Sequence, residues 1–107
     1  MTGKRRSPAR VFAALGDATR LALVKKLSRG QPLSITQLTE GCKLSRQAIT
    51  KHLRVLEGAG IVHSVREGRE SRFELDPEPI VSIRKYLDHV SEQWDQVLGR
   101  LKAFVEN

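Results

Sequence analysis

The sequence predicts a mainly α-helical fold with a small β-hairpin, arranged as a winged helix-turn-helix with five helices. Three patterns support this: a short basic helix after a glycine-containing turn, an arginine-bearing hairpin, and a long C-terminal helix. At 107 residues the chain has room for one domain with a modest core. We therefore expect a disordered basic arm over residues 1–6 and a single domain over residues 7–107.

Local signals predict three helices in the N-terminal part of the chain. Ser7 can cap the first helix, and Pro8 suits its first position because the missing N–H has no partner there. Asp17 can cap the second helix, and the pair Ser34 and Gln37 fits a capping box. The expected helices cover residues 7–16, a segment that ends at Gly30 and Pro32, and a short segment from about Ile35 to Gly41.

The stretch Leu44–Val62 predicts a fourth helix with two chemically different faces. When successive residues advance by about 100°, one arc is polar and the other is apolar except for His52. Arginine and lysine suit guanine edges or phosphates, and glutamine suits adenine, so the polar arc fits a DNA major groove. A solvated basic face on a surface helix is the alternative that this helix alone leaves open. The polar arc comprises Arg46, Gln47, Thr50, Lys51 and Arg54.

A hairpin is expected directly after this helix. Ile61–Arg66 and Glu70–Leu75 alternate as strands around the turn Glu67-Gly68-Arg69, with Phe73 and Leu75 pointing inward. Three arginines lie at or near the tip, where they can contact DNA or keep the strand edge from aggregating. They are Arg66, Arg69 and Arg72.

The last expected helix, over residues 77–105, carries apolar residues that alternate at spacings of three and four. This is the seam of a coiled coil, and the helix is about 40 Å long, more than one small domain can cover. We expect it to pack on a second copy in a two-fold dimer together with the first helix; folding back on its own chain is the alternative. The seam comprises Ile80, Ile83, Leu87, Val90, Trp94, Val97, Leu101 and Phe104.

The formal net charge of +7 favours a polyanionic partner. Residues 1–10 hold four basic residues and no acid, and residues 43–72 hold seven basic and three acidic residues, whereas residues 77–107 are slightly acidic. No apolar run is long enough to cross a membrane, and because no apolar stretch follows the basic N-terminus we do not expect it to act as a secretory signal. The single cysteine excludes an internal disulfide, so we expect a cytoplasmic protein.

Three blocks resemble the ArsR/SmtB family of winged helix-turn-helix transcriptional regulators, over roughly Ala9–Leu75 and more loosely in the last helix. They read VFAALGDATRLALVKKLSRG, LSRQAITKHLRVLEGAGIV and REGRESRFEL. Ala18, where family members often carry proline, is a small departure. The resemblance implies a homodimer, a repressor by analogy, whose fourth helices read inverted half-sites on double-stranded DNA.

The resemblance also assigns roles residue by residue. The fourth helix enters the major groove and the wing lies on flanking DNA, while the first and last helices form the dimer. DNA contact falls on Ser45, Arg46, Gln47, Thr50, Lys51, Arg54, Arg66, Arg69 and Arg72. The dimer interface falls on Val11, Phe12, Leu15, Ile83, Leu87, Val90, Trp94, Val97, Leu101 and Phe104.

A metal site, a cofactor and an enzymatic activity are not expected. The candidate ligands Cys42, His52, His63 and His89 are scattered, and His52 is expected to be a packed, hydrogen-bonded core residue. The family's C-x-C motif is replaced by ITQLTEG, and no histidine follows Asp88-His89. No phosphate loop or activated nucleophile is recognisable. A winged-helix protein-interaction module and a metal-sensing regulator remain as alternatives, and any effector is unknown.

Overall fold

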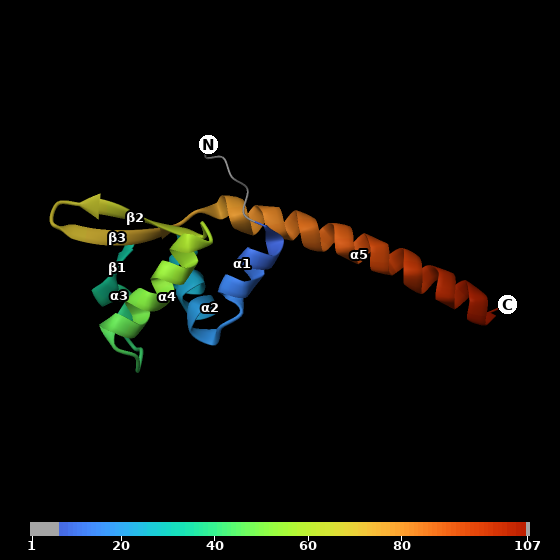
Figure 1. The fold of residues 1–107 in the computed structure, drawn as a ribbon, viewed down its shortest axis with the longest axis horizontal. Coiled ribbons are helices and arrows are strands. Elements are labelled where there is room, and N and C mark those ends of the chain that lie inside the picture. Colours follow the sequence, from blue (N-terminus) through green and yellow to red (C-terminus); the bar gives the residue numbers. More distant parts are fainter. Residues whose placement is uncertain (1–6, 107) are drawn as a thin grey trace.

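A computed structural model describes residues 7–106, which fold into five helices and three strands (Figure 1). The mainly helical class, the number of helices and the hairpin are confirmed. The expected arm over residues 1–6 lies outside the described residues. The elements are α1 (Pro8–Leu15), α2 (Ala18–Leu27), β1 (Leu33–Ser34), α3 (Ile35–Thr39), α4 (Arg46–Gly58), β2 (Val62–Glu67), β3 (Glu70–Leu75) and α5 (Pro77–Glu106).

The predicted caps begin the first four helices. Ser7 accepts a hydrogen bond from the Arg10 amide, and Asp17 accepts from two amides at the start of α2. Ser34 and Gln37 form the reciprocal bonds of a capping box. Ser45 accepts from the Ala48 amide at the start of α4. Since each cap satisfies amides that have no partner within the helix, the four caps determine where these helices begin.

The sheet has three strands in the order β1-β3-β2, and the strand β1 was not expected from the sequence. A two-residue strand is too short to show alternation, so only its pairing with β3, Leu33 opposite Phe73, reveals it. The hairpin turn between β2 and β3 contains Gly68, whose φ of 61° favours glycine. Through β1, the start of α3 is joined to the base of the wing.

The hydrophobic core lies between α1, α2, α3, the inner face of α4 and the base of the wing. Phe73 is buried, as predicted, and Leu75 packs against the same cluster. The fully buried side chains from the two helix-turn-helix helices are Leu38, Ile49, Leu53 and Leu56. This core therefore holds α4 by its apolar arc and leaves the opposite arc outward.

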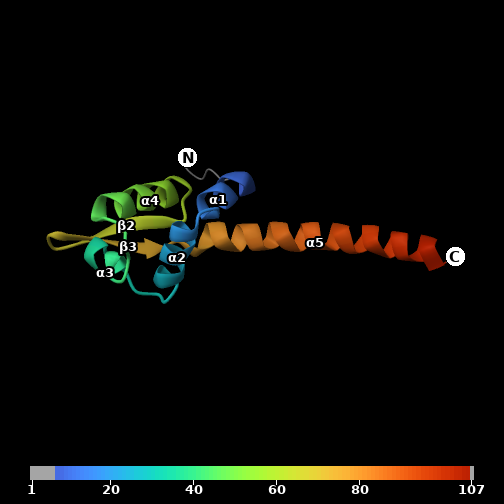
Figure 2. The same cartoon turned by 90° about the horizontal axis from the view of Figure 1, so that it is seen from below.

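Helix α5 leaves the winged body after its first turns and extends well beyond it (Figures 1 and 2). The protomer measures 68 Å along its longest axis, and its radius of gyration is 18.2 Å. A compact domain of this length has a radius near 13 Å. Trp94 and Phe104, which are 59% and 81% exposed, lie on this extension. The protomer covers Ile80 and Ile83 at the start of the seam but leaves the seam from Leu87 onward largely exposed. This disfavours the alternative of a helix folded back on its own chain.

Near its start, α5 packs against α1 of the same chain. The rings of Phe12 and Tyr86 lie 6.1 Å apart, and Tyr86 was not singled out from the sequence. Val11 is only 1% exposed and Ile83 is also buried. These two residues were expected at the dimer interface, but the protomer's own core already covers them, because α1 packs there on α5 and α4.

Candidate nucleic-acid interface

The outward arc of α4 is the basic surface that the sequence predicted. Within this arc Arg46, Gln47, Lys51 and Arg54 are exposed and Thr50 is half-buried, whereas Ile49 and Leu53 on the other side are fully buried. Because burial divides the helix along the same line as polarity, the basic arc is a surface of the folded molecule.

Side-chain bonds hold this helix in a defined position on α3. Arg46 Nη1 donates to Thr36 Oγ1 at 3.1 Å, and the Thr50 hydroxyl donates to the Arg46 carbonyl at 2.8 Å. Ser45 Oγ accepts from the Ala48 amide at 3.1 Å. The turn between α3 and α4 contains Gly41, whose φ of 76° suits a residue without a side chain. Ser45 and Thr50 thus have structural bonds, while Gln47, Lys51 and Arg54 extend outward.

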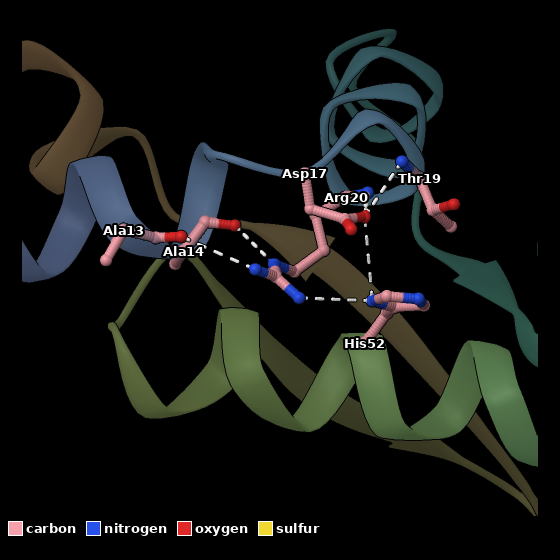
Figure 3. Close-up of polar contacts among 6 residues, drawn as sticks. All are labelled: Ala13, Ala14, Asp17, Thr19, Arg20 and His52. Carbon is pink, nitrogen blue, oxygen red and sulfur yellow. Dashed lines mark hydrogen bonds and ion pairs between the residues drawn. The ribbon is translucent and has the colours of Figure 1, made fainter.

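A polar network joins α1, α2 and α4 behind the basic arc (Figure 3). The Arg20 guanidinium donates to the Ala14 and Ala13 carbonyls and, through Nη1, contacts His52 Nδ1 at 3.2 Å. Asp17 Oδ2 lies 3.8 Å from the same His52 nitrogen. Because an arginine can only donate, this contact is a hydrogen bond in the tautomer whose Nδ1 carries no proton. The network connects the recognition helix to the two helices that precede it.

His52 is hydrogen-bonded, as predicted, but it lies at the margin of the core with 24% of its side chain exposed. Arg20, the main partner of His52, was not predicted from the sequence. The two residues are 32 positions apart, so no local pattern indicates their contact.

The carboxyl of Asp17 is stabilised in its charged form. The Arg20 amide bond is the largest influence that lowers its pKa below the ordinary value, with smaller contributions from the charges of His52 and Arg20 and from the Thr19 amide. Desolvation opposes this shift, but does not reverse it. Asp17 is therefore an anionic cap at neutral pH.

The three wing arginines differ in their surroundings. Arg72 forms ion pairs with Glu67 at 3.2 Å and with Glu70 at 3.0 Å, so two neighbouring carboxylates offset its charge. Arg66 and Arg69 are exposed near the turn, and neither makes an ion pair within residues 7–106. These two arginines are the cations that the wing presents without compensation.

The described part of the chain, residues 7–106, contains no group of three or more potential metal ligands. Cys42 is a half-buried free thiol, and His63 pairs instead with Glu74 across the hairpin at 2.8 Å. No helix within those residues is long and apolar enough to span a membrane.

A basic helix on a helix-turn-helix scaffold, followed by a cationic hairpin, defines the class of winged helix-turn-helix proteins. A family model described as a helix-turn-helix domain matches residues 15–65. The HTH-type transcriptional regulator Rv2034 of Mycobacterium tuberculosis is 39% identical over 95% of this chain and 92% of its own length. The chain belongs to the ArsR/SmtB family of DNA-binding transcriptional regulators.

Other known members show the same likeness. The arsenical resistance operon repressor of Escherichia coli is 28% identical over 94% of this chain and 83% of its own. The solved structure of an ArsR-like transcriptional regulator from Rhodococcus sp. RHA1 superposes with a TM-score of 0.79 at 36% identity, covering 91% of each chain.

Proposed function

We propose that the protein is a homodimeric repressor that binds inverted repeats in double-stranded DNA. The observation that supports this proposal is the outward basic arc of α4, whose opposite, apolar side is buried in the core. Two such helices about 34 Å apart would enter successive major grooves on one side of the duplex. Binding would then compete with transcription by occupancy of the operator, without catalysis, metal or cofactor, in the cytoplasm.

The proposal gives different tasks to the residues of the arc and wing. Gln47, Lys51 and Arg54 are the exposed side chains best suited to base edges, and Arg66 and Arg69 suit phosphates beside the groove. The orientation of α4 depends on the hydrogen bonds of Ser45, Arg46 and Thr50 described above. In the proposed complex these three residues also lie close to the DNA. Arg72 orders the wing through its two carboxylate partners.

The exposed apolar seam of α5 supports the dimer. Leu87, Trp94, Leu101 and Phe104 are all at least half exposed, and Val90 and Val97 between them are half-buried. Such a stripe needs a partner in water, and a second α5 offers the same heptad spacing. The Phe12 ring lies 6.1 Å from that of Tyr86 on α5, and Leu15 packs against the core cluster. Both half-buried residues are included in the proposed interface.

Binding of a labelled palindromic site, identified by selection, tests the groove assignment through Gln47→Ala. We expect affinity to fall roughly tenfold or more, because a lost bidentate base contact costs about 1–3 kcal/mol. Arg29→Ala serves as control, since Arg29 is exposed just after α2 and outside the basic arc. Wild-type affinity of Gln47→Ala, Lys51→Ala and Arg54→Ala alike would exclude α4 as the reading helix.

A further inference from the structure

A groove of about 490 Å³ runs between α1 and the C-terminal half of α4, beside the basic arc. Figures 1 and 2 show α1 and α4 side by side on one face of the winged body. The groove has a floor of small residues, among them Ala13 and Gly58. Its polar walls come from three arginines and no acidic side chain, namely Arg10, Arg20 and Arg54. The groove is therefore a cationic surface continuous with the face proposed to contact DNA.

The three arginines are not equally available. The Arg20 guanidinium is engaged with two carbonyls of α1 and with His52. Arg54 lies 3.4 Å from Glu57, a long contact that is compatible with a second partner. The Arg10 side chain makes no ion pair or hydrogen bond within residues 7–106. Arg10 is thus the cation of the groove with unused donors.

The position of Arg10 follows from its neighbours on α4. A Cβ atom placed on Gly58 would lie 3.9 Å from Arg10 Nη2, so the guanidinium rests over the last turn of α4. This is an ordinary van der Waals distance, so the guanidinium lies in contact range of α4. The partial negative charge of a helix C-terminus favours a cation there. This charge favours the Arg10 guanidinium at the α4 side of the groove.

The place of the groove in the assembly rests on the proposed dimer. Helix α4 lies between the wing on one side and α1 with α5 on the other (Figure 1). If α5 and α1 meet their mates at the two-fold axis, each groove lies between its own recognition helix and that axis. The DNA that runs past this position is the segment between the two half-sites.

We propose that the α1–α4 groove binds a backbone phosphodiester of the DNA between the half-sites, with Arg10 as the main donor. A phosphate oxygen suits the planar guanidinium, which can donate two parallel bonds. Arg54, which is assigned to a base edge, and Arg20, which is bonded within the protomer, add the attraction of their charges without a direct bond to this phosphate. Since α1 is also at the proposed dimer interface, this contact would make DNA affinity depend on the half-site spacing that the dimer geometry sets.

The test compares full-length wild type, Arg10→Gln and the control Arg29→Gln on one selected palindrome at several salt concentrations. We expect Arg10→Gln to bind about tenfold more weakly. Its slope of log affinity against log salt should be shallower by about 2, because two phosphate contacts per dimer are lost. Arg29→Gln should match wild type in both quantities. An unchanged slope for Arg10→Gln overturns the proposal, even if inorganic phosphate is found to bind the groove.

Neutral methylphosphonates at the central phosphates provide a second arm. We expect them to weaken wild-type binding but to cost Arg10→Gln little more, because the same contact is already absent. Equal losses for both proteins would place the Arg10 contact elsewhere and overturn the proposal. Gln47→Ala distinguishes a failure of the groove proposal from a failure of the proposed function. If Gln47→Ala binds more weakly while Arg10→Gln binds as wild type, only the groove assignment fails. If Gln47→Ala, Lys51→Ala and Arg54→Ala all bind as wild type, α4 is not the reading helix and the proposed function itself fails.

Discussion

Replacing Trp94 with alanine should dissociate the proposed dimer. Trp94 is 59% exposed, so about 150 Å² of its roughly 250 Å² of side-chain surface can be buried on dimerisation. At about 25 cal/mol per Å², burying this area contributes at most roughly 4 kcal/mol per chain. Association realises only part of such area-based values. If half is realised, the two copies together lose about 4 kcal/mol, which raises the dimer Kd roughly a thousandfold.

Sedimentation equilibrium measures this change directly. Trp94 is the only tryptophan, so the variant is best followed by peptide-bond absorbance. Gln96→Ala is the matched control, since Gln96 is exposed about 200° around the helix from Trp94. Circular dichroism should show that both variants keep their helices. A Trp94→Ala variant with the wild-type Kd would refute the seam as the interface, and so would a monomeric wild-type protein at micromolar concentration.

Three further predictions concern the protomer and the wing. Leu53→Ala, at a fully buried position of α4, should lower the free energy of unfolding in urea by about 2–5 kcal/mol, whereas Val55→Ala, at an exposed one, should change it little. The Asp17 carboxylate stabilises the fold above its unfolded pKa, and this stability is lost as pH falls through the lower folded pKa. Asp17→Asn should therefore flatten the decline in melting temperature below about pH 4. A decline as steep as that of the wild type would exclude the Asp17 carboxylate as a source of acid sensitivity. Arg69→Glu should weaken binding to all DNA sequences in anisotropy titrations, and a loss confined to the selected site would make the wing a base reader instead.

The sequence predicted those features that depend on neighbours along the chain. The caps Ser7, Asp17, Ser34 and Ser45 act within three residues, and the division of α4 into two faces repeats every turn. Helical periodicity therefore located the basic arc and the α5 seam. The same periodicity does not distinguish a residue buried within its own protomer from one that awaits a partner. The resemblance placed Val11 and Ile83 at the dimer interface, whereas both are buried within the protomer.

Features that depend on tertiary contacts were not predictable. Strand β1 exists only through its pairing with β3, and Arg20 meets His52 only after α2 and α4 pack together. Arg72 stays a predicted DNA contact, and its ion pairs with Glu67 and Glu70 are visible only in the folded hairpin. Arg10 belongs to a basic N-terminal segment in sequence, but its place over Gly58 emerges from the packing of α1 on α4.

Selection of bound sequences from random double-stranded DNA with the purified full-length protein tests the central claim most directly. The account predicts enrichment of one inverted repeat, with half-site centres about 10 base pairs apart, or a multiple of that spacing. Two-fold symmetry in the enriched site would support both base reading by α4 and the proposed dimer. Enrichment of a single unrepeated motif would contradict the dimeric mode, and no enrichment over the starting pool would contradict sequence-specific recognition by α4.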